Sequence, residues 1–190
     1  MEKEYRKISS DFSTSSDRTV IGLGAVFNSP SVDMGFIEVI HPSAITEETI
    51  KRSDIFCKLN HNDDKVLARS KYGEGSLLLS VDERGLSYCF EAPNTALGDE
   101  LLEYLKRGDI SGSSFAFTVS KEPNSEKWSK RSDGKIVRDI YLIDKLYDVS
   151  PVFQCAYEAT SCSKRFSEIQ ETISEVEGIL QTYKDEIEKL

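Results

Sequence analysis

The sequence is poor in histidine and cysteine, the side chains that hold zinc in structural sites. It contains two histidines and four cysteines, and the cysteines are Cys57, Cys89, Cys155 and Cys162. No two of them are close enough to form a Cys-x-x-Cys pair, so the sequence argues against a structural zinc site. The cytoplasm would keep these thiols reduced. We therefore expect Cys57, Cys89 and Cys155 to be buried as small hydrophobic residues.

Basic residues and long hydrophobic runs are also scarce. The 190 residues include 24 Lys and Arg against 33 Asp and Glu, which gives a net charge of −9. This excess of negative charge argues against non-specific binding of nucleic acid. No apolar run approaches the roughly 20 residues that a membrane-spanning helix needs, and the polar N-terminus lacks the apolar core of a signal peptide. The length suits one domain with a short appendage.

Short apolar or alternating segments, separated by turn residues, predict a β-rich domain. The segments expected to form strands are 19–28, 35–40, 54–60, 65–70, 76–81, 84–91, 113–120 and 135–153, the last as one or two strands. Within the segment 113–120, Phe115, Phe117 and Val119 should point to one face, and the smaller residues between them to the other. The first 18 residues are polar and should form a loose arm or an edge strand.

One internal helix is clearly indicated after these first strands. Four leucines between Leu97 and Leu105 recur at helical spacing. Asn94 or Thr95 can cap the start of this helix, and Gly108 can close its end. The sequence therefore predicts a helix between two strands of the domain.

A shorter helix is expected earlier in the chain. Pro42 ends a predicted strand, and Ser43 can cap a helix that continues through Lys51. Many short strands with one or two helices predict a mainly β fold with peripheral helices (α+β). The strands should form either a β-barrel or a packed sheet.

The last segment of the chain has a different pattern. Its apolar residues are spaced alternately by three and four, at Phe166, Ile169, Ile173, Val176, Leu180, Tyr183, Ile187 and Leu190. This unbroken heptad period favours a coiled-coil helix over residues 164–190. An amphipathic helix that packs on the protein's own domain would give a similar stripe, so both alternatives remain open.

His61 is the candidate general base. It lies in the segment LNHND, where a predicted strand ends and a loop begins. This position would expose an imidazole held by a rigid element, which suits a general base. A surface or capping histidine is the structural alternative. The other histidine, His41, precedes a proline and fits a turn.

A base of this kind needs a nucleophile, and Ser114 is the first candidate. It follows Gly112 in the segment GDISGSSFAF, where a turn leads into a strand. Glycine lets the backbone turn sharply and leaves amide groups near the serine, which could form an oxyanion hole. Ser111 and Ser113 are also candidates on chemistry alone, and a solvent-facing serine is the structural alternative.

Asp148 is the candidate acid. It lies in an otherwise apolar stretch, where a carboxylate is costly unless it is paired. It could orient a histidine and stabilise its charged form, or it could simply face outward from an edge strand. A thiol nucleophile is less suitable. Cys57 precedes His61 by four residues, which in a strand places them about 13 Å apart.

Five segments follow one another along the chain: FIEVIHPSAI, LNHNDDKVLAR, SVDERGLSYCFEAP, GDISGSSFAF and LYDVSPVFQCAYEAT. In this order they resemble the phage prohead protease family, the capsid-maturation serine proteases of tailed phages and related prophages. The resemblance covers about residues 19–162. The family is similar in fold to herpesvirus assemblin, a β-barrel serine protease surrounded by helices. The resemblance therefore implies an assemblin-like barrel, followed by the C-terminal heptad helix.

The resemblance also implies roles for individual residues. By position in the motifs, Ser114 is the nucleophile, His61 is the base and Asp148 is the orienting acid, where the family usually has Glu. Backbone amides near Gly112–Ser114, together with an arginine, would bind the oxyanion, and Arg138 is a candidate for that arginine. No metal or cofactor is implied.

The implied function is that of a serine endopeptidase acting in the host cytoplasm, inside the assembling prohead. Its partners would be the major capsid protein and the scaffold as substrates, and further copies of itself through the C-terminal helix. Neither nucleic acid nor membrane is expected to be a partner. The expected divisions are a polar arm (1–18), a protease domain (19–163) and the heptad helix (164–190). The alternative is a non-enzymatic capsid scaffold or assembly chaperone, which the acidic charge and the heptads also fit.

Overall fold

The computed structural model describes residues 3–9, 12 and 18–153. This described part is mainly β, as the sequence predicted, and contains twelve strands in three sheets together with two α-helices. None of its helices combines the length and the apolar character needed to cross a membrane. The heptad segment 164–190 and the predicted boundary at residue 163 lie outside the described residues.

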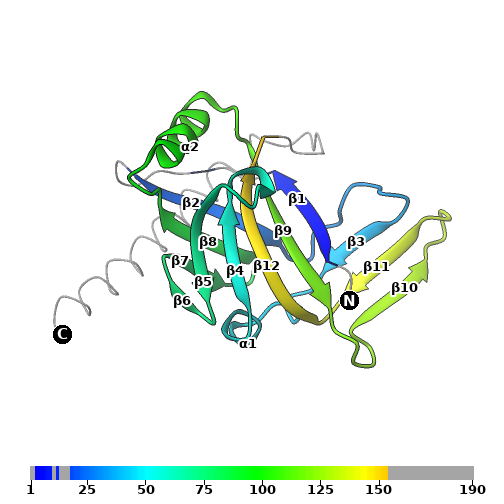
Figure 1. The fold of residues 1–190 in the computed structure, drawn as a ribbon. Coiled ribbons are helices and arrows are strands. Elements are labelled where there is room, and N and C mark those ends of the chain that lie inside the picture. Colours follow the sequence, from blue (N-terminus) through cyan, green and yellow to red (C-terminus); the bar gives the residue numbers. More distant parts are fainter. Residues whose placement is uncertain (1–2, 10–11, 13–17, 154–190) are drawn as a thin grey trace.

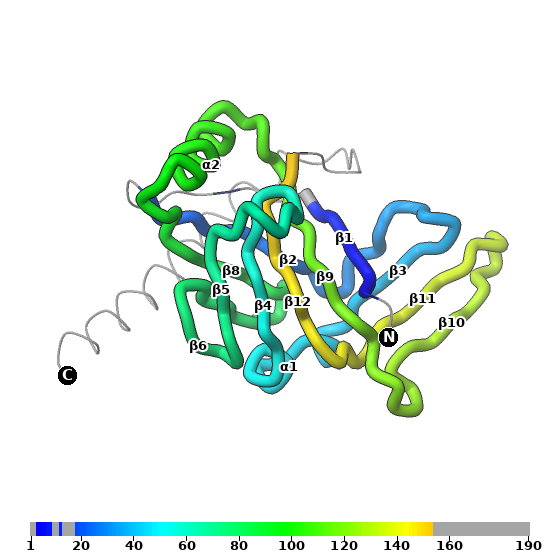
Figure 2. Tube along the Cα trace, in the orientation of Figure 1, coloured from blue at the N-terminus to red at the C-terminus, as the bar shows by residue number. Residues whose placement is uncertain are grey.

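The largest sheet has six strands in the order β1–β9–β12–β4–β5–β6 (Figure 1). Its strands are β1 (Glu4–Ser9), β4 (Asp54–Lys58), β5 (Val66–Lys71), β6 (Glu74–Gly75), β9 (Gly112–Val119) and β12 (Ile143–Val152). β12 is antiparallel to β9 and parallel to β4. The last strand along the chain thus lies in the middle of the sheet. Figure 2 shows β1 alongside β9, although the two strands are far apart in the sequence.

Two three-stranded sheets complete the fold. One contains β2 (Thr19–Val26), β8 (Gly85–Glu91) and β7 (Leu77–Val81), and the other contains β10 (Glu126–Lys130), β11 (Ile136–Ile140) and β3 (Ile37–Ile40). β2 contacts β9, β12 and β1, so the first of these sheets packs against the six-stranded sheet. The core between them contains side chains of both sheets, among them Val20, Phe90, Phe115 and Phe117.

The closed barrel implied by the resemblance is not found among the described residues. β1 and β6 remain the two edges of the six-stranded sheet, and no strand joins them. β6 has only two residues, which is too short to continue the ladder around a barrel. The hydrophobic face of the large sheet is instead covered by the β2–β8–β7 sheet. The strands therefore form packed sheets, which the strand pattern had left open as the alternative.

The longer helix, α2 (Ala96–Arg107), lies where the leucine spacing predicted it. Thr95 is its N-cap, since the threonine side chain accepts a hydrogen bond from the backbone N–H of Gly98. Gly108 ends the helix with a φ of 74°, a left-handed conformation that glycine adopts without strain. Leu101 is fully buried, so the leucine face anchors this helix on the core.

The shorter helix, α1 (Glu47–Lys51), begins later than the sequence predicted. Its N-cap is Thr46, which forms a capping box with Thr49. The predicted cap was wrong, because the Ser43 hydroxyl donates instead to the backbone carbonyl of Tyr141, 3.0 Å away.

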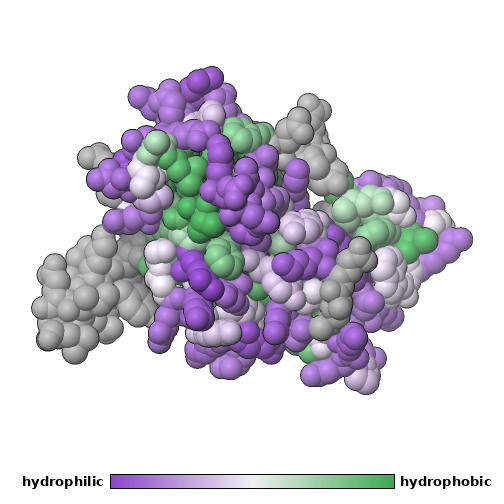
Figure 3. Space-filling view, in the orientation of Figure 1, coloured by the Kyte–Doolittle hydropathy of each residue, from purple (hydrophilic) through white to green (hydrophobic). Residues whose placement is uncertain are grey.

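Two further strands were not clearly indicated by the sequence. Part of the polar N-terminal segment forms β1, the edge strand that was one of its two expected conformations. β10 lies in a polar segment where the sequence predicted no strand, and all five of its residues are exposed. Trp128 on β10 and Ile136 on β11 are each about half exposed. Figure 3 shows hydrophobic surface at that end, on the right of the view, and a second hydrophobic area on the left, beside α2.

Candidate active site

The candidate nucleophile, Ser114, lies on β9 in the interior of the six-stranded sheet. It pairs with Lys7 of β1 on one side and with Ser150 of β12 on the other. Directly opposed residues of a ladder project to the same face, so Ser114 and Ser150 are side-chain neighbours. Phe115 and Phe117 belong to the hydrophobic core and stack on each other, as the predicted alternation requires.

Asp148 lies on the same face as Ser114, two residues before Ser150 on β12. Its side chain is 4% exposed. His61 Nδ1 lies 3.0 Å from Asp148 Oδ1. Because an ionised carboxylate can only accept hydrogen bonds, the imidazole donates from Nδ1, and Nε2 is left free to take up a proton. The structure thus brings two of the three predicted residues into direct contact.

His61 reaches Asp148 because of a sharp turn in the backbone. After β4 the chain forms a short 3-10 helix, η1 (Leu59–His61). Asn60 and His61 both have positive φ angles, 52° and 59°, which are uncommon for residues other than glycine. Such conformations persist where the surrounding structure holds them, and they cluster at functional sites. The ring of Tyr5 also packs edge-on against the imidazole, with 5.1 Å between the ring centroids.

Two atoms of this site have no hydrogen-bond partner. Among the described residues, the buried side-chain nitrogen and oxygen atoms without a partner are His61 Nε2 and Ser114 Oγ. No hydrogen bond joins the two atoms in this structure. Buried polar atoms are nearly always paired, and an exception needs an explanation. These are the two atoms between which a serine hydrolase transfers its proton, and catalytic hydrogen bonds are often long before substrate binds.

Lys58 supplies a positive charge beside the acid, and no sequence pattern indicated this role. Its Nζ lies 3.5 Å from Asp148 Oδ2 and 2.6 Å from Asp63 Oδ1. Burial opposes the charged form of Lys58, but the hydrogen bond to Asp63 and the charge of Asp148 outweigh it, so the pKa of Lys58 is raised. The buried Asp148 carboxylate therefore has a cationic neighbour as well as the histidine.

The other candidate serines and the second histidine have different surroundings. Ser113 projects to the face opposite Ser114, where its hydroxyl hydrogen-bonds to the Tyr88 hydroxyl at 2.7 Å. Ser111 precedes β9 and is not part of the strand. His41 Nε2 lies 2.9 Å from Asp139 Oδ1. None of these contacts involves His61 or Asp148.

Cys57 is not placed to act as a nucleophile. It is fully buried in the core, on the face of β4 opposite Phe56 and Lys58. Burial, followed by the negative charge of Asp148, raises the pKa of the Cys57 thiol well above its usual value. A thiol in this state is protonated and inert at neutral pH. As predicted, Cys57 and Cys89 are both buried; Cys155 and Cys162 lie outside the described residues.

The expected oxyanion donors are not supported by the structure. β9 forms ladders with β1 and β12 at once over Gly112–Phe117, so the amide groups near Ser114 are used within the sheet. Arg138 lies on β11, where its guanidinium contacts Glu4, Glu38 and Glu126. Three carboxylates already occupy its donors.

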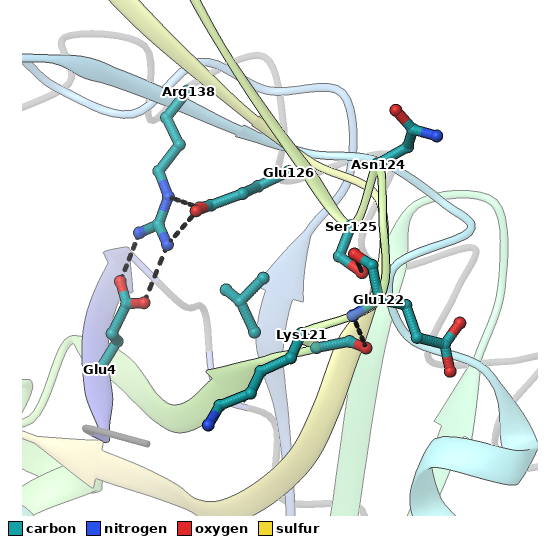
Figure 4. A pocket seen from close by; sticks show the side chains of 9 residues that line it. Glu4, Lys121, Glu122, Asn124, Ser125, Glu126 and Arg138 are labelled. Carbon is teal, nitrogen blue, oxygen red and sulfur yellow. Dashed lines mark hydrogen bonds and ion pairs between the residues drawn. The ribbon is translucent and has the colours of Figure 1, made fainter.

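Arg138 also borders a cavity of about 470 Å³, whose other lining residues are Glu4, residues 119–122 and residues 124–126 (Figure 4). In Figure 4 the guanidinium points to Glu4 and Glu126 and is held by both. None of the three candidate catalytic residues lines this cavity. The cavity and the candidate active site are therefore separate features.

A buried serine beside a histidine–aspartate pair is the arrangement found in serine hydrolases. Comparison with protein families agrees with the class of serine hydrolases and identifies one family within it. Residues 3–175 match the caudovirus prohead serine proteases, and the chain belongs to this family. No curated protein and no solved structure matches the chain.

Proposed function

We propose that this protein is the endopeptidase that matures a phage capsid. It cleaves the scaffold or the scaffolding arm of the major capsid protein, and it also processes itself. It acts inside the assembling prohead, in the cytoplasm of the bacterial host. Family membership supports a capsid-maturation serine protease. The observation that carries the assignment of residues is that Ser114 Oγ and His61 Nε2 are the buried atoms left unpaired beside the His61–Asp148 hydrogen bond.

In the proposed mechanism, Ser114 Oγ attacks the carbonyl carbon of the scissile peptide bond. His61 Nε2 takes the serine proton and then gives it to the leaving amine. Water attacks the acyl-enzyme in the second half of the reaction, with the same imidazole acting as the base. Asp148 holds Nδ1–H, which fixes the tautomer, and it stabilises the imidazolium that forms in both halves.

The burial of Ser114 implies a movement before attack. The residue is fully buried, and a peptide bond must come within contact distance of Oγ. Substrate binding is therefore proposed to open the face of the sheet around Ser114 and to shorten the distance between Oγ and Nε2.

The test is incubation of the full chain with its cognate major capsid protein and scaffold, followed by mass spectrometry of the fragments. Wild type should produce defined fragments, and Ser114→Ala should produce none above the background rate. Ser113→Ala is the matched control, because it removes a neighbouring buried hydroxyl on the opposite face of the same strand. Loss of cleavage in Ser113→Ala with normal cleavage by Ser114→Ala would show that the wrong serine was chosen.

The same experiment distinguishes the protease from a scaffold. A non-enzymatic scaffold or assembly chaperone would bind the capsid protein and leave every chain intact. Such a protein would have no reason to bring Ser114 and His61 together, whereas proton transfer in a protease requires it. Intact capsid protein after prolonged incubation with folded wild type would overturn the proposed activity.

A further inference from the structure

Ser150 lies between the candidate nucleophile and the candidate acid. It lies on β12 directly opposite Ser114 and is fully buried. Its hydroxyl donates a hydrogen bond to Asp148 Oδ1, the same oxygen that accepts from His61 Nδ1. One side chain is thus adjacent to the candidate nucleophile and bonded to the candidate acid.

The direction of the Ser150 hydrogen bond is fixed by its second partner. The backbone N–H of Lys58 donates to Ser150 Oγ at 3.0 Å. A hydroxyl has a single proton to donate. Because the carboxylate cannot donate and the Lys58 amide cannot accept, the Ser150 proton must point to Asp148. The chain of bonds therefore runs one way, from the Lys58 amide through Ser150 to the carboxylate.

This link also connects the strands that carry the acid and the base. The backbone pairing of β4 with β12 is recorded at Phe56 and Asp148. Two residues further on, the Lys58 amide bonds to a side chain of β12, the Ser150 hydroxyl. The chain then leaves the sheet and enters the turn that ends at His61. Ser150 thereby ties down β4 at the point where the chain departs to deliver the imidazole.

We infer that Ser150 is a positioning residue of the proposed protease: it holds the Asp148 carboxylate, and through it His61, in the orientation needed for proton transfer from Ser114. The inference rests on the proposed function. An aspartate side chain turns freely about its terminal bond unless both oxygens are held. Here Ser150 and His61 hold Oδ1, while Lys58 lies beside Oδ2. Without the hydroxyl, the buried carboxylate loses a charge-assisted hydrogen bond and its fixed orientation.

The test is a double-mutant cycle of Ser150→Ala and Asp148→Asn, assayed on a peptide that spans a cleavage site found in the capsid digest. Ser150→Ala alone should lower kcat about ten- to a hundredfold, the effect of one hydrogen bond to a charged group, and leave KM unchanged. In the Asp148→Asn background, Ser150→Ala should cause little further loss, because the charged carboxylate that the hydroxyl orients has been replaced by a neutral amide. Equal fold-losses in both backgrounds, or no loss in either, would overturn the inference.

A second pair of variants tests the Ser150 hydroxyl independently of whether Ser150→Ala folds. Ser150→Thr and Ser150→Val have the same shape and differ in the hydroxyl, so they share any packing cost. The Thr variant should be at least about tenfold faster than the Val variant in kcat, for the same reason. Equal rates in these two variants would contradict a role for the hydroxyl.

The outcomes separate this inference from the proposed function. If Ser114→Ala is inactive and Ser150→Ala matches wild type, the protease assignment stands and the role of Ser150 is wrong. If Ser114→Ala retains full activity, both fail. Ser113→Ala again serves as the control, since it also loses a buried serine hydrogen bond but should keep the wild-type kcat.

Discussion

Asp148 is the residue whose substitution tests the site most directly. Asp148→Asn keeps the shape of the side chain but cannot enforce the Nδ1–H tautomer or stabilise the imidazolium. We expect the variant to fold and to lose about 10³–10⁴-fold in kcat on the capsid substrate. Steady-state kinetics and circular dichroism on the same sample check both statements. A loss below about tenfold, roughly 1.4 kcal/mol in transition-state free energy, would make Asp148 a structural residue.

The raised pKa of the Cys57 thiol predicts that the folded protein loses stability at alkaline pH. Its raised pKa keeps the thiol protonated in the folded protein, whereas the unfolded chain loses the proton near the usual value of 9.0. Rising pH therefore stabilises the unfolded state, and the free energy of unfolding should fall above about pH 9, by at most about 1.4 kcal/mol per pH unit from this group.

Urea unfolding of wild type and Cys57→Ala between pH 7 and pH 10 measures this effect. The Cys57→Ala variant should be less stable at pH 7, because it leaves a small cavity, yet it should lose less stability between pH 9 and pH 10. Identical pH dependence in the two proteins would contradict the assignment. Burial also raises the pKa of Tyr88 in both proteins, and the smaller contribution that the charge of Cys57 makes to this shift is removed in the variant together with the thiol.

Asp148 and His61 could be proposed from the sequence because each stands in an unusual chemical context, and Ser114 because it follows Gly112 and matches a motif of the family that the chain resembles. Asp148 interrupts an apolar strand, and His61 is one of two histidines. Ser150 and Lys58 could not be found in this way. A serine or lysine on a strand is ordinary, and their importance comes from bonds between β4 and β12 that sequence periodicity does not encode. The backbone amides near Ser114 were expected to be free, and this prediction was wrong for a related reason. The order of the strands decides which amides form hydrogen bonds within the sheet.

At the scale of elements, β1 is fixed by charge as well as by backbone pairing. Arg6 on β1 contacts Glu38 on β3 at 2.5 Å, and Glu4 on β1 contacts Arg138 on β11. The side chains of Arg138 and Glu38 are 8% and 2% exposed. We call these four residues the Arg138 cluster. It joins the N-terminal strand of the large sheet to the β10–β11–β3 sheet.

Breaking the Arg138 cluster should destabilise the protein. Arg138→Met leaves Glu38 buried with one of its two cationic partners removed, and we expect a loss of about 3–5 kcal/mol in the free energy of unfolding. Chemical denaturation measures it. Arg84→Met is the control, because the pair formed by Arg84 and Asp82 is largely exposed and such pairs contribute about 0–1 kcal/mol. Similar losses in the two variants would show that the cluster adds nothing beyond a surface ion pair.

Elements with a strong local pattern were predictable, and those defined by long-range contacts were less so. The leucine spacing and Gly108 located α2, and the aromatic alternation located β9. β10 has no buried face, so its pattern resembled a loop, and it is a strand because it pairs with β11. The barrel expected from family resemblance depends on how sheet edges meet, which local periodicity does not determine.

At the scale of the whole molecule, residues 164–190 carry the remaining prediction. The heptad spacing requires a partner surface, because an isolated helix of this length is marginal in water. We expect this segment to drive self-association of the full chain, or its docking on scaffold. Light scattering of the full chain should therefore give a concentration-dependent size, and a version that ends at Ser163 should remain a monomer.

The light-scattering comparison of the two chains can also contradict this prediction. Equal sizes at equal concentration would exclude self-association by this segment. If the shortened version also unfolds at a lower temperature than the full chain, the apolar stripe belongs to the core of the protease domain.

The central position of β12 has a consequence for the order of events during synthesis. Of the six strands of the large sheet, β1 leaves the ribosome first, then β4, β5 and β6, then β9, and β12 comes last, yet β12 lies between β9 and β4. Until β12 is made, the strand bearing the nucleophile and the strand leading to the base have no common neighbour, and Asp148 does not yet exist. Pairings of this long range form late in folding. Under the proposed function, a nascent chain interrupted before residue 148 therefore has no complete site, and peptidase activity begins only with the completed sheet.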